Sequence, residues 1–183
     1  MAFRLFRSPT ARRAHLAARA PGRARISRVL RDGPPLHRLA IAVATLGGAG
    51  FLPHGGGLGA IAGALGAWAL ESRPGVSLLA LAMVTGVGLL AARVTIEVAG
   101  VDDPGECIVD EVAGSWLACL ASGLQGPWKV LPLVLFLLLD SVKPWPANVL
   151  DDHPGAFGAM ADDLAAGAWA ALIARILGLL GVG

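Results

Sequence analysis

Continuous apolar stretches dominate the chain and are separated by short breaks of charged residues, proline or glycine. Their continuity favours helices, because the strands of a membrane barrel alternate apolar and polar positions. A straight helix needs about 20 residues to cross a bilayer, and only 76–99 and 164–182 reach that length comfortably. We therefore expect an all-α fold, a polytopic membrane helical bundle of about four to six apolar helices, some of them short or re-entrant. The apolar stretches cover approximately residues 39–52, 58–70, 76–99, 112–124, 130–139 and 164–182.

The composition agrees with a membrane protein. Hydrophobic residues make up 55% of the chain without counting its 25 glycines, and charged residues make up 15%. An average soluble domain is about 25% charged. The length of 183 residues suits one compact bundle of a few spans. The two cysteines, Cys107 and Cys119, have no histidine cluster at ligand spacing beside them, which argues against a zinc site.

Basic residues are concentrated near the N-terminus. Residues 1–38 hold ten of the 15 basic residues and one acid, Asp32. We expect residues 1–35 to be a disordered tail that stays in the cytoplasm, since basic segments flanking a membrane span are retained there. Residues 36–183 are expected to form one membrane-embedded domain. The tail has only two aromatic residues for base stacking, so nucleic-acid binding is disfavoured. A mitochondrial transit peptide is the less favoured alternative for this arginine-rich, acid-poor segment.

The acids that follow this tail are clustered at the ends of the predicted helices. Ten of the twelve lie between Asp102 and Asp163. In a bundle of alternating spans, the stretch 112–124 leaves the membrane face on which it begins, and 130–139 returns to that face. The acids that flank these helices and open the last one therefore meet on one side of the membrane. They are Asp102, Asp103, Asp110, Glu111, Asp140, Asp162 and Asp163.

Such a convergence of carboxylates is electrostatically unfavourable without a cation. Carboxylates a few ångströms apart repel each other, and beside lipid they are poorly solvated. A divalent cation removes this repulsion, and oxygen ligands favour Mg²⁺, Mn²⁺ or Ca²⁺ over zinc or copper. Helix capping is the alternative for a single acid such as Asp110 or Asp162. Capping does not explain adjacent pairs of acids, nor Asp140 at a helix end, where the helix dipole disfavours a negative charge.

Three separated segments carry most of these acids. They read DPGECIVDEVAG at 103–114, FLLLDSVKPWP at 136–146 and GAFGAMADDLAAG at 155–167. In order and spacing these segments resemble the motifs of the phosphatidylglycerophosphatase A family. The resemblance implies Mg²⁺-dependent hydrolysis of phosphatidylglycerophosphate to phosphatidylglycerol and phosphate in phospholipid biosynthesis. It also implies a multi-pass protein of the bacterial inner membrane whose active site faces the cytoplasm and holds one or two Mg²⁺ ions.

The resemblance further implies roles for individual residues. For the substrate phosphate, a lysine offers a point charge and glycines allow close approach of the backbone. The residues expected to bind substrate are Lys143, Gly57, Gly59 and Gly158. The expected catalytic residues are Asp110, Glu111, Asp140 and Asp163. The expected metal ligands are Asp103, Asp110, Glu111, Asp162 and Asp163.

Two other functions remain open from the sequence. Leu137 stands where the family has an arginine, and the glycine loop at 55–60 lacks the family's hydroxyl residues. These departures suggest a catalytically degenerate membrane subunit. A small cation or proton transporter is the other alternative, but it predicts acids at mid-helix depth instead of at helix ends. We also expect 39–52 to be re-entrant or interfacial, so that the glycine loop lies on the acidic face.

Overall fold

The computed structural model describes residues 9–181, with side chains described from residue 20 onward. Every regular element in this part of the chain is helical, which confirms the all-α prediction. The α-helices are α1 (Pro9–Asp32), α2 (Pro35–Ala44), α3 (Gly55–Ala69), α4 (Pro74–Ala99), α5 (Val109–Ser122), α6 (Leu131–Val142), α7 (Ala147–Asp151) and α8 (Ala156–Leu179). Two short 3-10 helices, η2 (Ala49–Phe51) and η3 (Gly126–Val130), lie in the connections.

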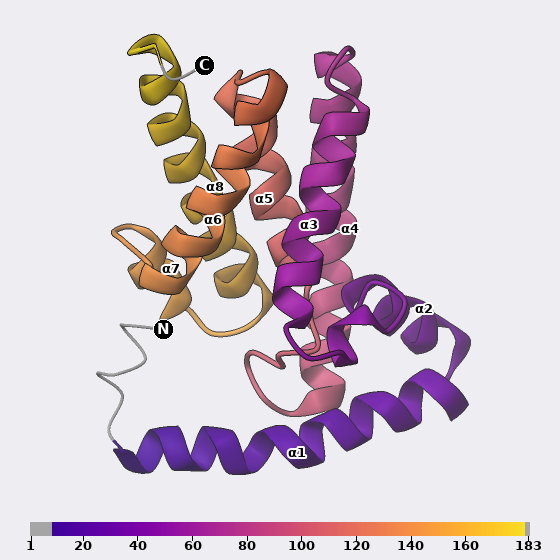
Figure 1. Cartoon of the computed structure of the whole chain (residues 1–183). Coiled ribbons are helices and arrows are strands. Elements are labelled where there is room, and N and C mark those ends of the chain that lie inside the picture. The colour runs from indigo at the N-terminus through magenta and orange to yellow at the C-terminus, as the bar shows by residue number, and fades with distance from the viewer. Residues whose placement is uncertain (1–8, 182–183) are drawn as a thin grey trace.

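Five of these helices, α3, α4, α5, α6 and α8, run side by side as a bundle (Figure 1). Successive members alternate in direction, so the starts of α3, α5 and α8 lie at the same end as the ends of α4 and α6. We call this end of the bundle the acidic end. Helix α1 runs crosswise beneath it (Figure 1). The sequence predicts that the acidic clusters meet if the helices alternate in direction, and the helices of the structure do alternate.

Helix α5 contacts both α3 and α8, and glycines bring the three backbones close together. A Cβ atom on Gly114 of α5 would come within 2.6 Å of the carbonyl oxygen of Asp163 on α8. A Cβ atom on Gly63 of α3 would overlap the carbonyl oxygen of Val112 on α5. Small residues allow this close approach, which is a main source of helix association where lipid removes the hydrophobic driving force. The spacing of the three helices is therefore fixed by backbone contact.

Two helices, α4 with 26 residues and α8 with 24, are long and apolar enough to cross a membrane by length and composition. They correspond to 76–99 and 164–182, the two stretches that the sequence marks as long enough to span, and within the described residues they are fewer than the four to six apolar helices, some of them short, that we expected. The other bundle helices α3, α5 and α6 have 15, 14 and 12 residues. Left-handed residues end α5 at Gly123 and α6 at Lys143. Helix α4 leaves large apolar side chains such as Leu79 and Leu90 exposed, as expected for association with lipid.

Helix α1 occupies most of the segment 1–35, which we expected to be disordered. Ile26 of α1 is fully buried and packs with Ile41 and Ala99. The guanidinium of Arg25 donates hydrogen bonds to the carbonyl oxygens of Val98 and Ala99 at the end of α4. Cations and donors at a helix C-terminus satisfy its free carbonyl groups. In the structure this part of the basic segment is thus a helix attached to the acidic end.

The segment 39–52 does not cross the bundle. Helix α2 ends at Ala44, and the chain turns through η2 before α3 begins at Gly55. The carbonyl oxygen of Ala44 accepts a hydrogen bond from Ile108 N, directly before α5. This contact holds the turn at the acidic end, and the glycine-rich start of α3 lies there as the sequence predicts.

Candidate functional site

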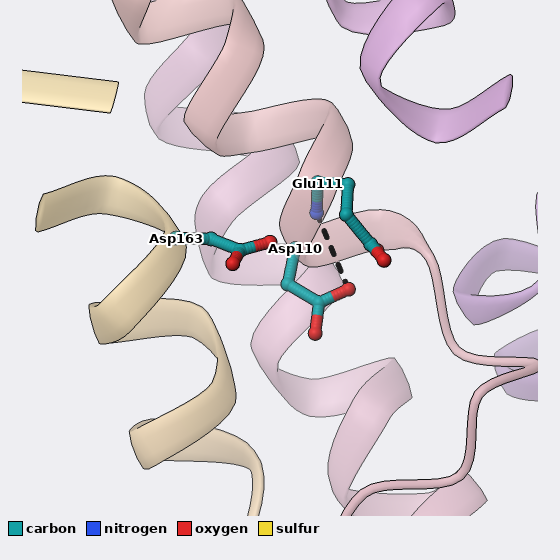
Figure 2. Close-up of side chains that lie close together, drawn as sticks. All are labelled: Asp110, Glu111 and Asp163. Carbon is teal, nitrogen blue, oxygen red and sulfur yellow. Dashed lines mark hydrogen bonds between the residues drawn. The ribbon is translucent and has the colours of Figure 1, made fainter. Parts of the chain in front are cut away.

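Carboxylates from three helices form two groups at the acidic end. In each group, one oxygen of every member lies within 4.8 Å of the others. The α5 group consists of Asp110, Glu111 and Asp163, and its side chains point toward one another from α5 and α8 (Figure 2). The α6 group consists of Asp140, Asp162 and Asp163. Asp163 belongs to both groups, so the five acids form one continuous site.

Asp110, Asp162 and Asp163 are buried, Glu111 and Asp140 are half-buried, and the site is poorly supplied with hydrogen-bond donors. The exposed fractions of Asp162, Asp163 and Asp110 are 2%, 5% and 6%. Within the described part of the chain, Glu111 Oε2 and Asp162 Oδ1 accept no hydrogen bond. Asp110 Oδ1 accepts one from the backbone N–H of Glu111, at 3.3 Å (Figure 2). Burying charged oxygens in this way costs several kcal/mol each unless a cation compensates. A buried, all-oxygen set of ligands fits a hard divalent cation.

The positions of the acids on their helices argue against simple capping. The apolar pattern predicts that Asp162 and Asp163 open the last helix, but α8 begins earlier, at Ala156. Both acids therefore lie inside the helix, beyond the reach of its free N–H groups. Asp140 lies in the last turn of α6, where the dipole disfavours a negative charge. No side-chain hydrogen bond caps the start of α5 either.

The glycines of α3 bring that helix against the α5 group. A Cβ atom on Gly56 would lie 2.5 Å from Glu111 Oε1, and one on Gly59 would lie 2.6 Å from the carbonyl oxygen of Ile108. Gly56 was not among the predicted substrate-binding residues, because its proximity to Glu111 depends on tertiary packing. Gly57 faces open space instead. Gly158 packs against the backbone of the segment before α8. The absence of a side chain at Gly158 therefore allows α8 to lie close to this segment.

Lys143 lies at the edge of the α6 group. Its ammonium donates hydrogen bonds to Asp162 and, at 2.7 Å, to Asp151 Oδ1. Burial lowers the pKa of Lys143, but the carboxylates of Asp162 and Asp151 outweigh this effect and raise the pKa above its ordinary value. Lys143 therefore stays charged. Asp151 was not among the predicted site residues, and no local sequence pattern connects it to Lys143.

Asp103 is the one predicted ligand that belongs to neither carboxylate group. It lies in the loop between α4 and α5. The thiol of Cys107 follows in the same loop. Burial, and then the negative charges of Asp110, Glu111 and Asp103, raise the pKa of Cys107 well above its ordinary value. The thiol therefore remains protonated and is a poor nucleophile.

The chain is thus an all-α bundle with two membrane-length helices and, at one end, a carboxylate site that could hold a divalent cation. Comparison with known proteins places the chain among the phosphatases. The family model for phosphatidylglycerophosphatase A matches residues 42–178, and the chain belongs to this family. This match confirms the resemblance found in the three acidic segments.

Two relatives match the chain, and both are named as phosphatases. Phosphatidylglycerophosphatase A of Escherichia coli (strain K12) is 31% identical over 154 residues, which cover 81% of this chain and 87% of the relative. A protein of Bacteroides thetaiotaomicron, provisionally named a phosphatidylinositol-3-phosphatase, is 29% identical over 97 residues, or 51% of this chain and 60% of that protein. No solved structure matches the chain.

Proposed function

We propose that the chain hydrolyses the terminal phosphomonoester of phosphatidylglycerophosphate to phosphatidylglycerol and phosphate, as a Mg²⁺-dependent step of phospholipid biosynthesis. The observation that carries the proposal is the buried carboxylate site, in which oxygens of Glu111 and Asp162 lack a donor within the described chain. Family membership supports the substrate. The position of the acids at one end of the bundle, instead of along a path through it, favours an interfacial enzyme over a transporter.

The two carboxylate groups would hold the metal. Asp110, Glu111 and Asp163 would hold one Mg²⁺ ion, and Asp140 and Asp162 would complete a second position with Asp163. When bound, Mg²⁺ supplies charge neutralisation to the phosphoryl oxygens. The glycine-rich start of α3 contacts Glu111 through Gly56 and keeps its carboxylate in place.

The chain's own groups would then carry the proton. The oxygen of a water molecule bonds to phosphorus while the bond from phosphorus to the glycerol oxygen breaks, in line with the attack. The Asp140 carboxylate, which is only partly buried, would accept the proton of the attacking water as general base, through the oxygen that it does not offer to the metal. The glycerol oxygen takes up a proton from solvent and leaves as the hydroxyl of phosphatidylglycerol. Lys143 contributes a fixed positive charge beside the departing phosphate.

Removal of metal is expected to abolish this activity in the purified full-length chain in detergent. With excess EDTA, phosphate release from phosphatidylglycerophosphate should fall to background, because the carboxylates then repel the substrate phosphate. Added Mg²⁺ or Mn²⁺ should restore it. Circular dichroism in EDTA checks that the helices remain formed. Full activity in EDTA, after exhaustive dialysis against chelator, would contradict a metal-dependent site.

We further propose a multi-pass position in the bacterial inner membrane with the acidic end facing the cytoplasm. The arginines of α1 support this orientation, because α1 crosses the acidic end and basic segments are retained in the cytoplasm. Single cysteines placed at Arg28 and at Asp152, in a chain without Cys107 and Cys119, should both resist a membrane-impermeant thiol reagent in intact cells. Both should react in inverted vesicles. Labelling of the two positions from opposite sides would refute the topology.

A further inference from the structure

The two carboxylate groups differ in their contacts with basic side chains. Lys143 Nζ donates to Asp162 Oδ2, and so contacts a ligand that belongs only to the α6 group. Within the described residues, no basic side chain forms an ion pair with Asp110, Glu111 or Asp163. Among the described residues, no cation competes for the α5 group, whereas the α6 group already has a cation at its edge.

The ammonium of Lys143 is held firmly in this place. Its side chain is 14% exposed and is bound by two carboxylates, of which Asp162 is the more deeply buried. Lys143 itself has a left-handed backbone with φ of 50°, and its N–H donates to the carbonyl oxygen of Leu139. A divalent ion that enters the α6 group must therefore compete with Lys143 for Asp162. It must also share Asp163 with an ion in the α5 group.

We infer that Lys143 is a resident counter-cation, so that the two metal positions fill in order, the α5 group first and the α6 group second in competition with Lys143. The inference rests on the proposed metal-dependent function and defines how its site is loaded. Asp162 Oδ1, which lacks a donor within the described chain, is the oxygen left free for the second ion. Asp151 then keeps the displaced ammonium at the edge of the site, where it can bind a phosphate oxygen.

Mn²⁺ binding to the full-length protein in detergent tests this order, with free Mn²⁺ measured by electron paramagnetic resonance. The wild-type protein should show one tighter and one weaker class of site. Lys143→Gln should tighten the weaker class by about tenfold, a typical coupling between neighbouring sites, and leave the tighter class unchanged. Asp151→Asn should weaken the weaker class further, because Lys143 then has Asp162 as its only carboxylate partner.

Lys129→Gln is the matched control. It removes the same charge from a lysine that pairs with Glu71 and lies over Trp68. Lys129 belongs to η3, which connects the end of α5 to the start of α6 and so lies opposite the acidic end. This variant should leave both classes of site unchanged. If Lys143→Gln fails to fold, the opposite effect expected of Asp151→Asn still tests the competition. A single class of site in the wild type and in both site variants would overturn the inference, as would weaker binding in Lys143→Gln.

Phosphate release from phosphatidylglycerophosphate, measured on the same preparations, separates this inference from the proposed function. Chelator-sensitive hydrolysis with unchanged metal binding in the two variants would leave the function standing and refute the order of filling. Ordered binding without hydrolysis would support the order of filling and refute the proposed function. A wild-type protein that binds no Mn²⁺ would refute both.

Discussion

Replacing Asp163 by Asn is expected to reduce phosphate release from phosphatidylglycerophosphate by a factor on the order of 10³ or more. Loss of one group that stabilises the charge of a transition state typically costs 10²–10³ in rate. Asp163 is the only described acid that belongs to both carboxylate groups, so its loss affects both metal positions. No other single substitution in the site should lower the rate as far.

The same variant should not be less stable than the wild type in the presence of chelator. Asp163 is 5% exposed, and it is surrounded by the negative charges of the other site acids. A neutral amide of nearly the same size removes that repulsion, whereas a carboxylate without a counter-ion is costly to bury. A site that reduces stability in return for function is a common trade-off. Thermal unfolding in EDTA, followed by circular dichroism, checks this expectation.

Asp152→Asn is the control for Asp163→Asn, because Asp152 is an exposed acid near the site and belongs to neither carboxylate group. Its activity and metal binding should equal those of the wild type. If Asp163→Asn retained more than about a tenth of the wild-type rate, well above the loss expected for a transition-state contact, the shared ligand would be misassigned.

The convergence of the acids could be predicted from the sequence because it depends only on how many helices lie between the clusters. Helices α5 and α6 leave and return to the same end, so acids before the first and after the second must meet. The number of residues in each helix does not enter this argument. For the same reason the acids converge although α3, α5 and α6 are shorter than a straight membrane span.

Other features of the site depend on tertiary contacts that no local pattern records. The start of α8 at Ala156 was missed because Gly158 and the acids Asp162 and Asp163 interrupt the apolar pattern of its first turns. In the structure these turns are helical, and Gly158 packs there against the preceding loop. Helix α1 was missed because a single apolar turn around Ile26 is a weak signal within an arginine-rich segment. The contact of Lys143 with Asp151 joins the residue that ends α6 to the last residue of α7, eight positions further along the chain.

Gly167→Ala is expected to destabilise the protein by about 3 kcal/mol, the upper part of the range for inserting one methyl group into a packed interface. The new Cβ atom would overlap the carbonyl oxygen of Gly114. Backbone cannot rotate away as a side chain can, so α5 and α8 must move apart. For a chain of this length, such a loss corresponds to a decrease in Tm of about 6–12 °C. Thermal unfolding in detergent, with Mg²⁺ present, measures it.

Gly86→Ala is the matched control, because nothing lies within 4 Å of a Cβ atom at this exposed position of α4. Alanine is a better helix former than glycine by up to about 1 kcal/mol, so this variant should be as stable as the wild type or more stable. Replacing glycine by alanine is thus expected to lower the stability of the protein at Gly167 and to maintain or raise it at Gly86. Equal Tm values for the two variants would show that the contact between α5 and α8 is not close.

The separation of α5 from α8 should also reduce activity beyond what the loss of stability explains. Gly114 lies against the carbonyl oxygen of Asp163, so the glycine contact and the α5 group share the same stretch of α8. If the two helices move apart, Asp163 is withdrawn from Asp110 and Glu111, and the α5 group loses its ligand from α8. Gly167→Ala should therefore bind Mn²⁺ more weakly at temperatures where it is still folded. Weaker binding in a folded variant would link the glycine packing of the helices directly to the chemistry of the site.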